Sequence, residues 1–170
     1  MGQTHTTPAK PEFPGFLPTW DLGSFEAWLL EQDFTGMNLD DCFHLALLNG
    51  KLPGEACNID RMISKFSKRY VECHSEGGLE QFADRDAVFV LCFSLLMLQT
   101  DLHNPRIRDK MSRENYTRNL RGANGGGDFD FAFVSRLYDS ILRYPLGSLN
   151  RPIVEPTPAV LTKSAASVRA

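Results

Sequence analysis

One run of twelve residues, 87–98, is apolar except for Ser94. A segment of this kind has no polar face, which is typical of a helix buried in a protein core, and it is shorter than the ~18 apolar residues of a membrane-spanning helix. We therefore predict a helix over about 84–100. The polar residues 100–104 follow, and Pro105 then forces a change of chain direction. A polar turn is expected at that point.

Helical periodicity recurs along most of the chain. Ser24 and Ser112 are candidate N-caps for helices that start one residue later, and Asp130 can start the last helix. Two more helices are expected from 38 or 39 to 49 and from about 55 to 70, with loops at 74–78 and 124–127, the latter flexible because of its glycines. No segment alternates as a strand does, so the predicted fold class is all-α. Composition divides the chain into an irregular leader (1–23), one helical domain (24–150) and a disordered tail (151–170).

The composition of the 170 residues excludes several function classes. A net charge of -3 gives no general attraction to nucleic acid. The four cysteines lack the spacing of a zinc site, so we expect reduced thiols and no metal. No phosphate-binding loop or hydrolase motif occurs, so no nucleotide cofactor is expected. The first six residues fit the short myristoylation pattern at Gly2, which allows a weak membrane anchor.

Two places carry candidate chemistry. Glu55 follows Pro53-Gly54, a pair that forms a tight turn and holds the next side chain outward near a helix N-terminus. It is either a binding or catalytic acid or simply an N-terminal helix acid. His103 and Asn104 lie in the polar turn before Pro105. They either bind a partner or satisfy backbone groups of that turn.

Six ordered blocks of this sequence resemble the Sec7 domain family, and the resemblance covers about 25–145. The blocks are 34–39, 52–60, 61–70, 100–110, 118–122 and 137–141. The resemblance implies an all-α right-handed helical array and a guanine-nucleotide exchange factor that releases GDP from Arf-family small GTPases. Such a factor performs no covalent chemistry and needs no cofactor, because Mg²⁺ and GDP or GTP belong to the GTPase.

The resemblance also implies a role for individual residues. Glu55 matches the family's glutamic finger, which displaces the nucleotide, and Asn104 matches a polar contact to the opened GTPase. Seven further positions form or border the groove that receives the GTPase: Phe89, Phe93, Met97, Ile107 and Met111 line it, and Asp60 and Asp109 lie beside it. The implied location is the cytoplasm, with recruitment to Golgi, endosomal or plasma membranes.

The sequence departs from the family pattern in several places. Gly50, Cys57 and Gln99 replace the usual aromatic residue, glutamine and asparagine. The family also has several helices before the block that matches at 25, so an N-terminally shortened domain is expected. Three interpretations therefore stay open: an active exchange factor, a module that binds an Arf protein without exchange, and a helical interaction fragment with no GTPase partner.

The resemblance extends to brefeldin A, which binds between some Sec7 domains and GDP-bound Arf. Sensitive members tend to carry Tyr-Ser, Asp and Met at four positions, and resistant members Phe-Ala, Ser and Pro. This chain has Phe93, Ser94, Asp101 and Met111 there. Because only the tyrosine hydroxyl is missing, the pattern predicts intermediate sensitivity.

Overall fold

A computed structural model describes residues 21–49 and 56–152 of the chain. These two ranges form six α-helices and no β-strand, which confirms the predicted all-α class. The helices are α1 (Leu22–Glu31), α2 (Leu39–Asn49), α3 (Ala56–Cys73), α4 (Arg85–His103), α5 (Arg113–Asn119) and α6 (Phe131–Arg143).

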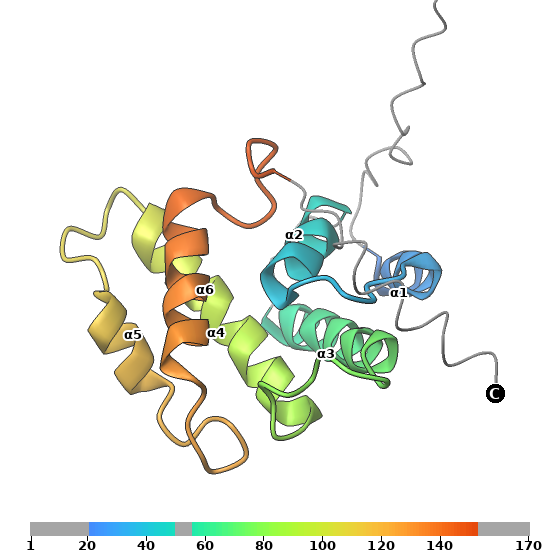
Figure 1. Ribbon diagram of the computed structural model, residues 1–170. Helices are drawn as coiled ribbons and strands as arrows, with labels where there is room; N and C mark the ends of the chain where they lie inside the picture. Colours follow the sequence, from blue (N-terminus) through green and yellow to red (C-terminus); the bar gives the residue numbers. More distant parts are fainter. Residues whose placement is uncertain (1–20, 50–55, 153–170) are drawn as a thin grey trace, which may run out of the picture.

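Helix α4 is the centre of the molecule (Figure 1). It packs against α3 on one side and α6 on the other, while α1 and α2 pack on α3, and α5 packs on α6. Eight of its side chains are buried, among them Leu91, Leu95 and Leu98. By length and composition α4 would also be able to cross a membrane. Its buried contacts with α3 and α6 instead identify it as the core helix that the apolar run predicted.

Side-chain caps explain where the helices begin. Ser112 accepts a hydrogen bond from the amide three residues later, as predicted. Asp130 caps α6 in the same way, at the predicted start of the last helix. The predicted N-cap at Ser24 is wrong, because Asp21 caps α1 by accepting from the amides of Gly23 and Ser24. A carboxylate with two amide donors at a helix start satisfies backbone groups that a single hydroxyl would leave open.

Two helices run further than their sequence patterns predicted. Helix α3 ends at Cys73 instead of Tyr70, and α4 ends at His103 instead of Thr100. The polar residues Thr100 and Asp101 therefore belong to the last turn of α4 and not to a loop. Polar side chains are compatible with a helix where they reach solvent, and the helix stops only where Pro105 excludes α geometry for the residue before it.

The glycine loop 124–127, predicted to be flexible, is closed by hydrogen bonds. Asn124 and Gly127 exchange two backbone bonds of 3.0 Å. The Asn124 side chain accepts from the amide of Ala83 at 2.7 Å and donates to the carbonyl of Gln81 at 3.1 Å. The loop is thereby fixed to the turn that precedes α4. Gly125 has a φ of +60°, and a Cβ there would lie 2.6 Å from Ala83 Cβ, so a side chain does not fit.

The segment after α6 folds back over α2, so the folded part extends beyond the boundary predicted at 150. The amide of Leu146 donates to Gln99, one of the family departures, and the amide of Gly147 donates to His44 Nδ1 at 2.9 Å. Arg151, which the composition assigned to the tail, is 6% exposed. Its guanidinium contacts Asp40 at 2.7 Å and Asp41 at 3.4 Å.

Candidate functional site

The central helix leaves one apolar face uncovered by the described residues. Phe93 and Met97 are 43% and 58% exposed, Val90 is 38% exposed, and Phe89 is half-buried. We call these four residues the exposed ridge of α4. Phe93 lies three or four residues from each of the other members, which places all four on one side of the helix. A core helix normally hides such side chains, and contiguous exposed apolar groups mark interaction sites.

Asn104 ends α4 and has two roles in the turn that follows. Its backbone amide donates to the Thr100 carbonyl at 3.1 Å, and its side-chain Oδ1 accepts from the Arg106 amide at 3.0 Å. Its side-chain Nδ2 has no hydrogen-bond partner among residues 21–49 and 56–152. Asn104 is therefore a helix C-cap whose amide group keeps a donor for another molecule.

The other predicted groove residues separate into two groups. Ile107 and Met111 are half-buried in the loop between α4 and α5, and both follow the end of the exposed ridge along the chain. Asp109 is exposed on the same loop, whereas Asp60 is exposed on the first turns of α3. The structure thus assigns six of the predicted residues to α4 and the loop after it, and Asp60 to α3.

Glu55, the predicted finger, lies outside the described residues. Helix α3 begins at Ala56, the next residue. The role of Glu55 and the orientation of its side chain stay predictions.

His103 is a structural residue by its contacts. Its Nε2 lies 2.7 Å from the carbonyl oxygen of Ile141, so the imidazole joins the end of α4 to α6. His103 thus satisfies a backbone carbonyl, as one interpretation predicted, but that carbonyl belongs to α6 and not to the turn before Pro105.

Several supporting residues were missed by the sequence analysis. The Tyr138 hydroxyl donates to the Met111 carbonyl at 2.7 Å, and the hydroxyls of Ser94 and Tyr116 lie 2.7 Å apart. Both contacts tie the surroundings of the ridge to α5 and α6. Burial raises the pKa of Tyr116 above its ordinary value, so its hydroxyl keeps its proton. Partners more than twenty residues apart leave no local sequence signal.

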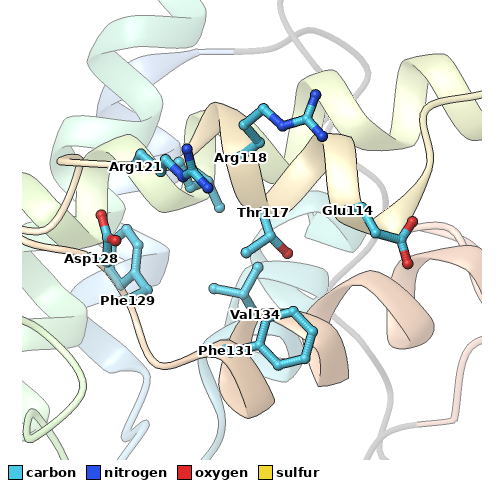
Figure 2. Close-up of a pocket in the computed structure, with 9 residues that line it drawn as sticks. Glu114, Thr117, Arg118, Arg121, Asp128, Phe129, Phe131 and Val134 are labelled. Atoms are coloured by element: carbon cyan, nitrogen blue, oxygen red, sulfur yellow. The ribbon is translucent and has the colours of Figure 1, made fainter.

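A pocket of about 370 Å³ lies between α5 and α6, and Figure 2 shows the residues that line it. Its apolar lining includes Phe129 and Phe131, and its charged lining residues are Glu114, Arg118, Arg121 and Asp128. The two positive and two negative charges cancel, and none of the predicted site residues lines this pocket. Among the residues that the structure describes, no group of three or more His, Cys, Asp and Glu side chains could hold a metal ion.

Comparison with known proteins identifies what these features belong to. The family model of the Sec7 domain matches residues 20–146. The chain is 44% identical over 109 residues to the ARF guanine-nucleotide exchange factor GNL2 of Arabidopsis thaliana, which covers 64% of this chain and 8% of the relative. It is 38% identical over 142 residues to a Dictyostelium discoideum protein with ankyrin repeats, PH and SEC7 domains, which covers 82% of this chain and 14% of the relative. It is also 39% identical over 130 residues to the Brefeldin A-inhibited guanine nucleotide-exchange protein 1 of Rattus norvegicus. That alignment covers 76% of this chain and 7% of the relative.

Solved structures give the same result for the fold. A Sec7 domain bound to ARF1-GDP and brefeldin A has a TM-score of 0.66 at 34% identity, covering 74% of this chain and 62% of that one. The Sec7p catalytic domain has a TM-score of 0.63 at 37% identity, covering 70% and 61%. The chain thus spans a small part of its curated relatives and less than two thirds of these solved domains. A match over residues 20–146, together with these helical neighbours, shows that the chain belongs to the Sec7 domain family.

Proposed function

We propose that this chain accelerates GDP release from an Arf-family small GTPase. The proposal is supported by relatives named as ARF guanine-nucleotide exchange factors and by a structural neighbour that holds ARF1-GDP. The observation that carries it is the exposed ridge of α4. An apolar strip in the middle of a core helix, next to a C-cap whose amide donor has no partner in the described part of the chain, has the mixed character of a protein-binding surface.

The ridge supplies binding, and Glu55 supplies the chemistry. In the GTPase, GDP is held by phosphate charges that Mg²⁺ and a lysine of the phosphate-binding loop balance. A carboxylate that enters this site repels the β-phosphate and pairs with the freed lysine. GDP then leaves without any covalent bond being made or broken. The exchange factor acts by stabilising the nucleotide-free GTPase.

The test is GDP release from several Arf proteins with the Glu55→Lys variant. Reversing the charge next to the phosphate should lower the release rate about 100-fold or more, because one preorganised electrostatic group is commonly worth that much. The melting temperature should not change. Glu76→Lys is the control, since Glu76 is an exposed acid in the loop after α3 and makes the same charge change elsewhere. Exchange by Glu55→Lys within twofold of the unmutated chain would reject the finger.

The same assay separates the alternative function. Capture of nucleotide-free Arf without any GDP release would identify a binding module, and failure to capture it would leave a helical interaction domain without a GTPase partner. For location, we propose action in the cytoplasm with recruitment to Golgi, endosomal or plasma membranes where the GTPase acts. Gly2 is the candidate anchor, and its position lies outside the described residues.

A further inference from the structure

The loop after α4 is held by one lysine that the predicted site does not include. The Lys110 ammonium donates to the Asp101 carbonyl at 2.8 Å and to the Asn104 carbonyl at 2.5 Å. The Asp101 carbonyl belongs to the last turn of α4, where carbonyls have no partner within the helix. A cation at this end also complements the helix dipole. Lys110 therefore closes the loop by bonding the last turn of α4 and its C-cap residue, Asn104.

Asp101 also contacts the far end of this loop through its side chain. Its carboxylate oxygen accepts a hydrogen bond of 2.5 Å from the Met111 amide, next to Lys110 in sequence. The Tyr138 hydroxyl donates to the Met111 carbonyl, which fixes this end of the loop to α6. Between these two ends, the Ile107 amide donates to the Asn104 carbonyl at 3.1 Å.

We propose that Asp101 and Lys110 form a clasp that positions Asn104 for the GTPase. The inference rests on the proposed function for what Asn104 meets, and on the hydrogen bonds above for how it is held. Lys110 bonds the backbone carbonyl of Asn104, and Asp101 holds the end of the loop at Met111. Together they fix the direction of the Asn104 Nδ2 donor. Lys110 is thus a positioning residue that acts through Asn104, and its ammonium need not contact the GTPase.

The clasp itself is tested by amide hydrogen exchange of the full chain. Lys110→Met keeps the aliphatic stem and removes the ammonium, so the amides of Ile107 and Met111 should exchange about tenfold faster. Arg108→Met is the matched control, because it removes one positive charge from the same loop and Arg108 has no ion pair within residues 21–49 and 56–152. Unchanged protection in Lys110→Met, or an equal loss in Arg108→Met, would overturn the clasp.

The positioning role is tested by a double-mutant cycle in GDP release. Lys110→Met should lower kcat/KM about tenfold in the unmutated chain and less than about twofold when Asn104→Ala is already present. Lys110→Arg, which restores two donors to the carbonyls, should recover most of the rate. Equal losses in both backgrounds would show that Lys110 acts independently of Asn104. If the unmutated chain releases no GDP, the proposed function fails, and amide protection alone still decides the clasp.

Discussion

Two regions of this molecule reverse the usual placement of charge and apolar surface. The buried ionic cluster of Asp40, Asp41, Ser140 and Arg151 encloses charges under the segment after α6, with Asp40 only 2% exposed. In the exposed ridge of α4, by contrast, the apolar side chains of Phe93 and Met97 are exposed. The cluster is closed because every charge in it has a partner, while the ridge is open because none of the described helices covers it. The first arrangement serves the fold, and the second is suited to a partner.

The electrostatics of the cluster follow from this enclosure. Burial alone would raise the pKa of Asp40, but Arg136, Ser140 and Arg151 outweigh that effect and lower it below its ordinary value. Asp41 has fewer partners, so burial and the neighbouring Asp40 charge raise its pKa. Arg151 is the cation that lies between both acids, and it contacts both at the same Nη2 atom.

The largest expected effect is the loss of the Arg151 cation. Arg151→Met leaves two buried carboxyl groups without their shared partner, and such a change typically costs about 3–5 kcal/mol. Urea denaturation measures the loss. Arg136→Met is the control: Arg136 also bonds Asp40, at 3.1 Å, but its side chain is 43% exposed, so about 1 kcal/mol or less is expected. Equal losses for the two variants would show that burial of the cluster does not matter.

A second prediction concerns His44, which lies beside the cluster. Burial, followed by the nearby Arg151 charge, lowers the pKa of His44 to about 4, while the unfolded chain titrates at about 6.5. Between these values only the unfolded state binds the proton, so stability is lost as pH falls from 6.5 to 4, by at most about 3 kcal/mol. The bond from the Gly147 amide requires an unprotonated Nδ1.

The control for His44 is His44→Asn, whose side-chain oxygen can accept the Gly147 amide and does not titrate. The difference in unfolding free energy between the two proteins, measured at several pH values, isolates the His44 contribution from that of Asp40 and Asp41. A difference that stays constant from pH 7 to pH 4 would contradict the prediction.

Truncation of a ridge side chain should weaken Arf binding and leave stability nearly unchanged, whereas truncation of a neighbouring core side chain should lower stability. Met97→Ala removes exposed apolar surface, so we expect about 2 kcal/mol weaker binding of nucleotide-free Arf, roughly 30-fold, with stability changed by about 0.5 kcal/mol or less. The neighbouring Leu98 is 0% exposed, and Leu98→Ala should cost about 2–5 kcal/mol of stability. Pull-down titrations and thermal melts distinguish the pair. Two variants with the same profile would show that the ridge is not a separate surface.

The smallest expected effect is a change in the brefeldin A sensitivity of GDP release. We predict intermediate sensitivity of GDP release to brefeldin A, increased by Phe93→Tyr, because one added hydrogen bond is worth about 0.5–1.5 kcal/mol, a factor of roughly 2–13. Asp101→Ser should remove the sensitivity, and the structure adds a reason, since Asp101 also holds the Met111 amide. Inhibition curves at fixed Arf·GDP concentration check both variants. An active Phe93→Tyr chain that ignores the drug would contradict this groove geometry.

The sequence by itself determined the features that depend on neighbours along the chain. The all-α class, the cap at Ser112, the helix start near Asp130 and the core helix around Leu91–Leu98 follow from periodicity and from side chains that reach amides three residues away. The family resemblance, carried by ordered motifs, likewise identified the Sec7 domain. The misplaced cap at Ser24 shows the limit of such reasoning, because two nearby polar residues competed and Asp21 makes more bonds.

Only the tertiary structure decided which face of α4 is exposed and that Arg151, in the segment assigned to the tail, is buried. Phe93 and Leu95 are both apolar members of one run, and their difference in burial depends on where α3 and α6 pack. Arg151 is the first residue of the segment whose composition is typical of disorder, yet it pairs with Asp40, 111 residues earlier. Such pairs form because burial of one charge requires its partner, wherever in the chain that partner lies. Sequence patterns around either residue therefore do not predict the pair.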